Sequence, residues 1–559
     1  MTININGKDY PFKEGQTILS IARENNIEIP TLCYLKNIIE EGSCRICMVE
    51  LENGRLVPAC STKASEGMKI QTKSEKVVSS RTNTLKLLLS EHYKSCSYCP
   101  KNTKCDLQKL FIEYGVTEEN NEGKTQKRFD ASSPCIVRNN NKCILCGRCV
   151  SICKNTQSVS ALTKAKRGNN TFIGCVLDKD ITKSTCVGCG QCTLVCPTAA
   201  LMEKDSTMEV EEVLRNKEYK VYAQIAPSVR VSLAEAFGNP IGTFEEGKMV
   251  TALKTLGFDK VFDVNLGADF TVVEESKELL ERVKKGENLP LFSSCCPAWF
   301  KFVQNFYPEH ANMLSSCKSP TEMLGAIIKN YYSQKENIDK EKIKVIGIMP
   351  CTAKKGEKER GKDVDYVLTT RELASLIKKH DIDFNNLPKQ DFDHPLSYYS
   401  GAGLIFGATG GVTEAVLRNV MAEIDDKKVD FEEVRKSEGR KEVKVKCGET
   451  ELNLCIVNGL SNARKVMDDI VSGKKVYHFV EVMDCQGGCV NGGGQNYVDY
   501  SKVDIEDVKK LRAAALYNKD KEIKDRVSSK NLTMQEIYND FFIPSPQLAK
   551  QLVHYRQED

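Results

Sequence analysis

Three short motifs in the second half of the chain carry cysteines that could hold a metal cluster. They contain Cys296 in SSCCPAW, Cys351 in IMPCTAKKGEKE, and Cys485 and Cys489 in EVMDCQGGCVNGGGQ. Thiolates are the usual ligands of iron–sulfur clusters, and the glycines at 487, 488 and 492–494 would let the backbone approach a bulky, rigid group. The motifs therefore predict one cubane held by loops that are far apart in the sequence.

Cys295, immediately before Cys296, poses a separate question. Adjacent side chains point in different directions, so the two thiols cannot serve one metal in equivalent ways. An isolated buried cysteine is most often a small apolar packing residue. Beside a candidate ligand, however, a second thiol needs an explanation of its own.

The cysteines of the N-terminal part fall into tight groups. The 559 residues include 25 cysteines, and the start MTININGKDY leaves no room for a signal peptide, so we expect a cytoplasmic protein with free thiols. A C-x10-C-x2-C-x12-C array favours a plant-type [2Fe–2S] cluster over zinc, which usually shows two C-x2-C pairs. The ligands of this cluster would be Cys33, Cys44, Cys47 and Cys60.

A second group combines one histidine with three cysteines, as His92-x3-Cys96-x2-Cys99-x5-Cys105. Zinc accepts this ligand set equally well by type alone. The position of the group between two redox modules favours a histidine-ligated [4Fe–4S] cluster. One imidazole in place of a thiolate makes such a cluster less negative and alters its potential.

The third group is an internal repeat. CILCGRCVSIC and CVGCGQCTLVCP both have the C-x2-C-x2-C-x3-C spacing of bacterial ferredoxins, in which the fourth cysteine ligates the other cluster. The repeat therefore predicts two [4Fe–4S] clusters. One would be held by Cys143, Cys146, Cys149 and Cys196, and the other by Cys153, Cys186, Cys189 and Cys192.

The elements that position these motifs change along the chain. TINI, Asn6-Gly7 and KDYPF predict a hairpin, and an apolar face at Ile18, Leu19, Ile21 and Ala22 predicts a helix. EYKVYAQIAP and KIKVIGIMPC indicate buried strands of an α/β core. We expect a multidomain α+β and α/β protein. Its domains would be a β-grasp [2Fe–2S] domain (1–80), a small histidine- and cysteine-ligated [4Fe–4S] domain (81–125), a 2[4Fe–4S] ferredoxin-like domain (126–208) and a large α/β domain (209–559).

Composition excludes several other classes of protein. The chain is 41% hydrophobic and 28% charged with a formal charge of +4, so nothing in it demands nucleic acid or an anionic membrane. Apolar runs long enough to span a bilayer are missing from the sequence. Without a G-x-G-x-x-G after a strand or a flavin signature, direct oxidation of NADH by this chain is not expected.

The three C-terminal motifs resemble the signature loops of the [FeFe]-hydrogenases, TSCCPxW, PCxxKxxE and a C-x3-C followed by glycines. The N-terminal array resembles the clostridial monomeric type with four accessory clusters, and the similarity continues to PSPQLAKQLVHY near the end. The resemblance implies the reaction 2H+ + 2e− ⇌ H2, with protons and H2 as substrates and ferredoxin or flavodoxin as electron carrier. It also implies that dedicated maturation proteins assemble the active site.

For the active site the resemblance implies an H-cluster. Its cubane would be ligated by Cys296, Cys351, Cys485 and Cys489, and the Cys489 sulfur would bridge to a two-iron subsite with carbon monoxide, cyanide and azadithiolate. Lys354 and Ser228 match residues that contact the cyanides, and Met349 and Met483 match pocket methionines. Outside such motifs a lone methionine is normally a core residue.

The resemblance also accounts for the cysteine doublet. With Cys296 as ligand, Cys295 keeps a free thiol that can pass protons near neutrality once its surroundings tune it. The family's proton path matches Glu275, Glu278 and Ser315, and Arg282 would pair with Glu278 near the surface. Read without the resemblance, the two glutamates would be a solvated helix face.

The sequence departs from the family at a few positions. Asp484 stands where a small apolar residue is common, and would either lower the cluster potential or point to solvent. Thr321 occupies a position where many relatives carry glutamine, Asn496 replaces a proline, and Ser293 in place of threonine is a mild change. The remaining cysteines are interpreted as small apolar fillers with some sensitivity to oxidation. They are Cys135, Cys175, Cys317, Cys447 and Cys455.

Two other classes of protein are alternatives to a hydrogenase. A non-catalytic electron-transfer subunit would explain residues 1–208 but not the C-terminal loops, and a hydrogenase-like sensor or assembly protein would not need Cys295 and Glu275. One group of lysines would form either a docking surface for an acidic ferredoxin or an ordinary solvated face. Its members are Lys94, Lys101, Lys104 and Lys109. We expect a monomer.

Overall fold

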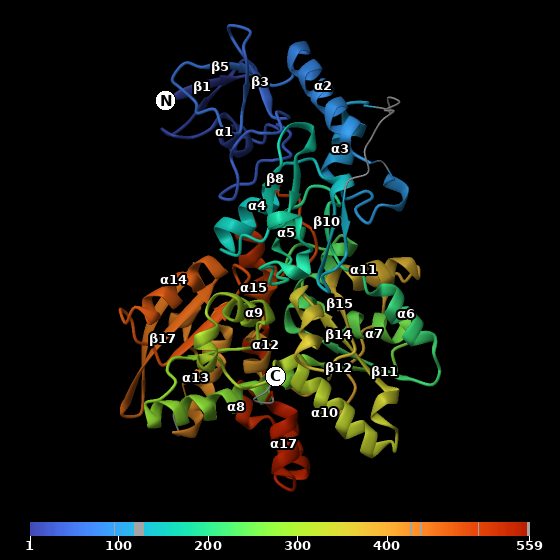
Figure 1. Ribbon diagram of the computed structural model, residues 1–559, viewed down its shortest axis with the longest axis vertical. Coiled ribbons are helices and arrows are strands. Elements are labelled where there is room, and N and C mark those ends of the chain that lie inside the picture. Colours follow the sequence, from blue (N-terminus) through green and yellow to red (C-terminus); the bar gives the residue numbers. More distant parts are fainter. Residues whose placement is uncertain (94, 117–127, 425–427, 436–438, 501, 556–559) are drawn as a thin grey trace.

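The computed structural model describes residues 1–93, 95–116, 128–424, 428–435, 439–500 and 502–555. Four modules follow one another from the N-terminal domain, at the top in Figure 1, through the accessory modules to a large C-terminal domain. The predicted boundary at 125–126 and Lys94 lie outside the described residues. Among the described residues, no helix is both long and apolar enough to cross a membrane.

The N-terminal domain is a mixed sheet with one short helix against it. The predicted hairpin forms as β1 (Thr2–Ile5) and β2 (Lys8–Pro11), and β1 pairs in parallel with β5 (Lys69–Gln71). The strand order is β2-β1-β5-β3-β4, with β3 at Met48–Leu51 and β4 at Leu56–Pro58. The predicted apolar face of α1 (Ile18–Glu24) is buried.

Two small accessory modules follow. The first consists of α2 (Glu75–Glu91), a 3₁₀ turn at Cys96–Tyr98 and α3 (Asp106–Glu113). The second has a three-stranded sheet in the order β10-β7-β6 and the hairpin β8–β9. Its elements are β6 (Phe129–Asp130), β7 (Ile136–Asn139), α4 (Arg148–Ser151), β8 (Thr163–Ala165), β9 (Phe172–Gly174), α5 (Gln191–Val195) and β10 (Leu201–Glu203).

The C-terminal domain is built on two four-stranded sheets. The first, in the order β12-β11-β14-β15, is fully parallel, and its central strands are buried on both faces as the sequence predicted. These strands are β11 (Lys220–Ile225), β12 (Lys260–Asp263), β14 (Ile343–Met349) and β15 (Tyr366–Thr369).

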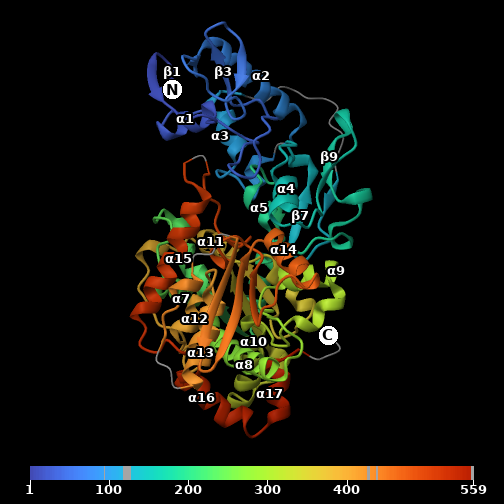
Figure 2. The ribbon, with the colours of Figure 1, turned by 90° about the vertical axis from the view of Figure 1, so that its left-hand side faces the viewer.

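The second sheet has the order β13-β18-β17-β16, and Figure 2 shows its long orange strands below the teal accessory module. Strands β13, β18 and β17 are parallel, and β16 is antiparallel to β17. The sheet consists of β13 (Leu291–Phe292), β16 (Arg440–Cys447), β17 (Thr450–Asn458) and β18 (Phe479–Met483).

Helices surround both sheets, and two of them start at residues that matter for the site. Pro297 at the first position of α9 (Pro297–Phe306) begins this helix directly after Cys296, and Asp263 caps the start of α8 (Val264–Lys285). The other helices are α6 (Thr207–Arg215), α7 (Gly247–Leu256), α10 (Pro320–Lys335), α11 (Thr370–Lys379), α12 (Gly401–Ile405), α13 (Gly411–Glu423), α14 (Leu460–Val471), α15 (Ile505–Glu522), α16 (Leu532–Ile537) and α17 (Pro546–Val553).

A buried ion pair joins the accessory module to the C-terminal domain. Arg371 at the start of α11 donates to both carboxylate oxygens of Glu203 on β10, at 2.8 and 2.7 Å, and also to the backbone oxygens of Gly493 and Gln495. A bidentate guanidinium fixes orientation as well as distance. The loop that follows Cys489 is therefore held against the module that carries the cysteine repeat.

Candidate iron–sulfur and proton-transfer site

The three cysteine motifs of the C-terminal domain all follow the carboxyl ends of parallel strands. Cys296 comes after β13, Cys351 after β14, and Cys485 after β18. The carboxyl ends of parallel strands are the usual place for ligand sites in α/β folds, because their loops gather at one edge of a sheet. The strand pattern thus brings together cysteines that are far apart in the sequence.

The four predicted cubane ligands lie close enough to influence one another. Burial raises the pKa of Cys485 well above its ordinary value, and the charges of Asp484, Cys351, Cys489 and Cys296 act in the same direction. Four thiols with such depressed acidity are poorly stabilised as free thiolates. Coordination to iron would compensate for their burial, and the set therefore fits a cubane.

Asp484 is buried beside these thiols and does not point to solvent, which excludes one of the two predicted orientations. Its Oδ1 accepts from the Cys296 thiol at 3.1 Å and from the Cys485 thiol at 3.4 Å. Burial raises the pKa of Asp484, against the hydrogen bonds from the two thiols. The carboxyl group therefore contacts two candidate ligands of the same cubane.

The two cysteines of the doublet pack against different apolar clusters. Cys296 packs against the apolar cluster that contains Trp299 and Cys351, together with cysteines of the accessory repeat. Cys295 packs against the other cluster, which contains Val272 of α8 and Met483. The charges of Glu275 and Cys489 add to burial in raising the pKa of Cys295 well above its ordinary value. Cys295 is thus a neutral thiol between α8 and Cys489.

The accessory repeat forms two separate cavities. Cys143, Cys146, Cys149 and Cys196 line one cavity, and Cys153, Cys186, Cys189 and Cys192 line the other. This is the grouping that the crossover of the fourth cysteine predicts. Among the described residues, no three histidine, cysteine or acidic side chains converge as the ligands of a single metal ion would. Thiols spaced around a cavity fit a cluster of several irons.

The N-terminal ligand candidates lie on loops as predicted. The hydrogen bond with Cys47 and burial raise the pKa of Cys60, and the charges of Cys47, Cys33 and Cys44 act in the same direction. The four thiols are therefore neighbours. His92 ends α2, Cys96 and Cys99 flank the 3₁₀ turn, and Cys105 precedes α3.

A glutamine of the repeat connects the accessory module with the cubane site. The side-chain N–H of Gln191 donates to the Cys485 sulfur at 3.1 Å and to the Asn491 oxygen at 3.0 Å. Gln191 lies between Cys189 and Cys192 and lines their cavity. One side chain therefore touches both the accessory cavity and a candidate ligand of the next cluster.

Of the predicted proton-path residues, Ser315 and Glu278 are hydrogen-bonded, whereas Glu275 has no hydrogen bond of good geometry among the described residues. The Ser315 hydroxyl donates to Glu278 Oε2 at 2.9 Å, and the predicted ion pair of Arg282 with Glu278 is confirmed at 2.6 Å. Burial raises the pKa of Glu275 to about 8, and the charge of Glu278 acts in the same direction. Glu275 is fully buried, so the interpretation as a solvated helix face is wrong for it.

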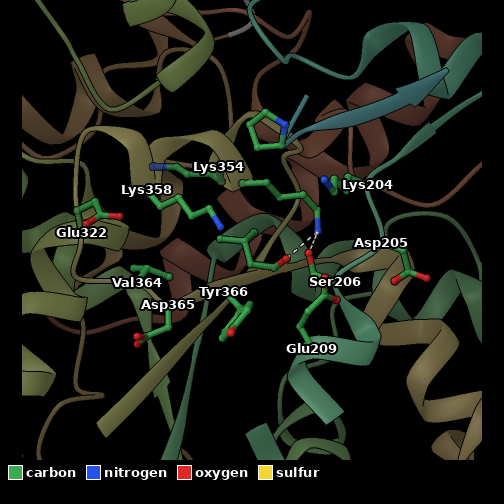
Figure 3. Close-up of a pocket in the computed structure, with 13 residues that line it drawn as sticks. Lys204, Asp205, Ser206, Glu209, Glu322, Lys354, Lys358, Val364, Asp365 and Tyr366 are labelled. Atoms are coloured by element: carbon green, nitrogen blue, oxygen red, sulfur yellow. Dashed lines mark hydrogen bonds between the residues drawn. The ribbon is translucent and has the colours of Figure 1, made fainter. Parts of the chain in front are cut away.

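The predicted subsite contacts Ser228, Met349 and Met483 are buried. Ser228 is buried and donates to the Gly407 oxygen at 3.2 Å, and the Met349 sulfur lies 3.6 Å from the Thr321 hydroxyl. Lys354 pairs with Glu357 at 2.7 Å, and this pair keeps its pKa above the ordinary value although burial opposes the charge. Figure 3 shows Lys354 on the wall of a polar pocket, near Lys358 and Glu322.

Two sequence-based interpretations need correction. Lys101 is not part of a surface patch: it is buried, donates to the Cys196 oxygen and lies 3.9 Å from the centre of the Tyr497 ring. The glycine run does not need a cofactor to explain it. A side chain at Gly492 or Gly493 would collide with the Pro350 or Cys189 oxygen, each only 2.2 Å from the added carbon.

Sequence reasoning missed two polar residues at the site. Gln191 gave no signal, because glutamine is not a typical ligand. Glu481 on β18 is buried and accepts from the N–H groups of Gly410 and Thr413 at the start of α13, which orients that helix beside the site. Its charge also acts on the Cys295 thiol.

Comparison with known proteins covers nearly the whole chain. Residues 219–493 match the family described as "Iron only hydrogenase large subunit, C-terminal domain", and residues 506–556 match "Iron hydrogenase small subunit". The N-terminal part matches a 2Fe-2S iron-sulfur cluster binding domain (1–75), the NADH-ubiquinone oxidoreductase-G iron-sulfur binding region (81–120) and a 4Fe-4S dicluster domain (142–200).

Two relatives are similar along their full length. NADP-reducing hydrogenase subunit HndD of Solidesulfovibrio fructosivorans is 41% identical over 99% of this chain and 98% of its own. Iron hydrogenase 1 of Clostridium pasteurianum is 39% identical over 99% of both chains. A solved structure of apo [FeFe]-hydrogenase HydA1 from Chlamydomonas reinhardtii covers 63% of this chain and 98% of its own, at 32% identity and a TM-score of 0.56.

The fold and the site together define an iron–sulfur protein whose cysteine groups extend from the accessory modules to a buried centre. The comparisons then assign the chain: it belongs to the [FeFe]-hydrogenase family and is a hydrogenase with iron–sulfur clusters and an H-cluster.

Proposed function

We propose that this chain catalyses 2H+ + 2e− ⇌ H2 with separate routes for protons and electrons that meet at the Cys295–Cys296 doublet. The observation that carries the proposal is that the two thiols pack against different apolar clusters. Cys296 lies with Cys351 and the accessory cysteines, whereas Cys295 lies on the side of α8. Protons would arrive on the Cys295 side, and electrons on the Cys296 side.

The H-cluster would be held by residues that the three loops bring together. Its cubane would take Cys296, Cys351, Cys485 and Cys489 as ligands, with Lys354, Ser228, Met349 and Met483 around the two-iron subsite. When bound, the subsite supplies the metal chemistry that forms and splits H2. Because Cys489 acts electrostatically on Cys295, this cubane ligand would lie near the thiol that carries protons.

The chain's own residues would carry protons in four steps. Glu278 receives a proton at the solvent side, and the Ser315 hydroxyl, 2.9 Å away, passes it inward. Glu275 holds it, because a carboxyl group with a pKa of about 8 stays largely protonated at neutral pH. Cys295 accepts a proton on one side as it releases one on the other. A relay thiol of this kind does not need to ionise, so its raised pKa is compatible with the role.

The accessory modules would carry electrons to the cubane, with one [2Fe–2S] and three [4Fe–4S] clusters. Gln191 supports the last step, since it touches both the cavity of Cys153, Cys186, Cys189 and Cys192 and the Cys485 sulfur. Ferredoxin or flavodoxin would deliver the electrons to a monomeric, cytoplasmic enzyme matured by dedicated assembly proteins.

A second electron partner is favoured by one comparison. The relative HndD is named as a subunit of an NADP-reducing hydrogenase, and it matches this chain from end to end. This chain would then pass electrons from H2 to a separate NADP-reducing subunit rather than to ferredoxin. Reduction of NADP by the purified chain with that subunit, but not with ferredoxin alone, would select this partner.

The doublet provides the test of the proton route. Cys295→Ala should leave the H-cluster in place, so its carbon monoxide and cyanide infrared bands should persist, while turnover falls by about 10²–10⁴-fold or more. Cys295→Asp should recover part of the rate with a shifted pH profile. Cys296→Ala should instead lower the iron content. Near-complete turnover in Cys295→Ala would show that the thiol is a packing residue.

A further inference from the structure

The C-terminal segment covers the solvent end of the proton path described above. Residues 553–555 run antiparallel to residues 316–318: the Lys318 N–H donates to the Val553 oxygen at 2.7 Å, and the Tyr555 N–H to the Ser316 oxygen at 3.1 Å. Ser315 of the proton path immediately precedes this paired strand. The backbone thus fixes the end of the chain directly over the path.

His554 connects this segment to Glu278 through one hydroxyl group. The His554 Nδ1 lies 3.0 Å from the Ser316 oxygen, and the same hydroxyl donates to Glu278 Oε2 at 3.4 Å. On its other side, the His554 Nε2 lies 3.4 Å from Glu274 Oε2. Its side chain is 20% exposed, so it reaches solvent while it remains in the hydrogen-bonded chain.

Glu278 needs a partner that can exchange protons with water. Arg282 pairs with it but keeps its proton at any physiological pH, because a guanidinium cannot be deprotonated in proteins. A serine hydroxyl does not change its charge near neutrality. Imidazole is the side chain whose ordinary titration falls between about pH 5 and 8. Of the side chains joined to Glu278 by these hydrogen bonds, His554 has the required chemistry.

The surroundings of His554 contain both signs of charge. Burial alone would raise the pKa of Glu274, but hydrogen bonds from His554, Lys277 and Tyr538 lower it to about 2. Glu274 is therefore a carboxylate at working pH. The imidazole ring of His554 is held between this carboxylate and the Ser316 hydroxyl. The groups that face His554 are Glu274, Lys277 and Glu278 on α8, Tyr538, Cys317 and Lys318, and the adjacent Tyr555.

We propose that His554 is the proton-loading group of this hydrogenase, taking protons from solvent and passing them through Ser316 to Glu278. The inference rests on the proposed path from Glu278 to Cys295. The proton moves from the imidazolium Nδ1 to the Ser316 oxygen as the Ser316 hydroxyl proton moves to Glu278. The neutral imidazole then takes a new proton from water or buffer.

The cost of losing His554 should depend on pH. Direct capture of hydronium at a ceiling of about 10⁹ M⁻¹s⁻¹ supplies about 10³ protons per second at pH 6 but only about 10 per second at pH 8. Because each H2 takes two protons, assays driven at about 10² turnovers per second in dilute buffer consume about 2 × 10² protons per second, so His554→Gln should lose about 20-fold at pH 8 and less than about 2-fold at pH 6. Added imidazole should restore the rate at pH 8.

The matched control is His310→Gln, which changes a histidine that pairs with Glu309 away from this path and should leave both rates unchanged. A second measurement does not use activity. In ¹³C-histidine-labelled full-length protein without the two-iron subsite, the signal lost in His554→Gln should titrate between about pH 5 and 8. Rescue by imidazole keeps the kinetic test decisive even if His554→Gln loosens the C-terminal segment.

Three results would overturn the proposal: an unchanged rate at pH 8, an equal loss at both pH values without rescue, or a histidine signal that does not titrate in this range. Cys295→Ala, measured alongside, separates this inference from the path on which it rests. If Cys295→Ala collapses turnover while His554→Gln does not change it, the path stands and protons reach Glu278 elsewhere. If Cys295→Ala is also fully active, the path itself is wrong.

Discussion

Glu275→Gln should make the enzyme slower and, at higher pH, more stable. The amide has nearly the same shape as the protonated carboxyl group but cannot release a proton, so turnover should fall by about 10²–10⁴-fold. Glu275 is fully buried, and neither of its carboxyl oxygens has a hydrogen-bond partner of good geometry among the described residues. Ionisation there is costly in the folded state, and the variant removes that cost.

The size of the stability effect follows from the shift in pKa. Burial raises the pKa of Glu275 from 4.5 to about 8, so between these values the folded state binds a proton that the unfolded state has lost. Stability therefore falls as pH rises from about 4.5 and levels off above about 8. Integrating the proton difference from pH 5 to 8 gives a loss of about 3.5 kcal/mol for the wild type, which Gln at this position should not show.

The assay is chemical denaturation of the anaerobic holoenzyme at pH 5 and pH 8, followed by loss of cluster absorbance. The quantity to compare is the change in the free energy of unfolding between the two pH values. Any constant difference between the amide and the carboxyl group cancels in this change. Glu281→Gln is the control: Glu281 lies on the same helix but is exposed and paired with Lys285. It should follow the wild type at both pH values.

Two results would refute this reasoning. If wild type and Glu275→Gln lose the same stability from pH 5 to pH 8, Glu275 is not a buried neutral acid in the holoenzyme. If Glu275→Gln turns over at the wild-type rate, protons do not pass through this carboxyl group, whatever its pKa.

Three other perturbations test the electron side. Gln191→Leu removes an N–H donor to the Cys485 sulfur and should lower the cubane reduction potential, measured by a redox titration with electron paramagnetic resonance. Asp484→Ala removes a carboxyl group beside two ligand sulfurs and should shift that potential upward, with the iron content unchanged. Deleting residues 1–127 should spare turnover with a small, strong reductant and slow it with ferredoxin.

Each of these perturbations has a contrary outcome. An unchanged cubane potential in Gln191→Leu would mean that its hydrogen bond is absent in the holoenzyme. A lower potential in Asp484→Ala would show that this carboxyl acts as a neutral hydrogen-bond donor. Equal losses with both electron donors after deletion of residues 1–127 would make the N-terminal modules structural rather than electronic.

Local signals in the sequence were enough to predict much of this fold. The Asn6-Gly7 turn and the apolar face of α1 depend on neighbouring residues, and both elements form as predicted. The uninterrupted apolar runs at β11 and β14 indicated parallel strands buried on both faces, as the first sheet has them. The cysteine spacing likewise predicted how the repeat divides its eight cysteines between two cavities.

The features that could not be predicted depend on contacts between distant segments. Lys101 was expected at the surface because lysine usually lies there, but Tyr497 and the Cys196 oxygen, far along the chain, cover it. Asp484 had two possible orientations, and only the packed position of Cys296 selects one of them. His554 reaches the proton path from the end of the chain, through backbone pairing that leaves no local pattern.

In the proposed function, the two cysteines of the doublet separate the route of protons from the route of electrons by one peptide bond. Strand β13 ends at Phe292, and Pro297 begins α9, so the loop between them is short and its two thiols must face different neighbours. Cys296 packs with cysteines of the accessory repeat, which would bring electrons, and Cys295 packs on the side of α8, where Glu275 would hold a proton. A charge moving on one side is felt on the other, because burial leaves little solvent to screen it. Each electron that reaches the cubane should therefore make proton transfer through Cys295 more favourable. The two routes must be close enough for this coupling, yet they cannot share a ligand, and adjacent cysteines satisfy both conditions.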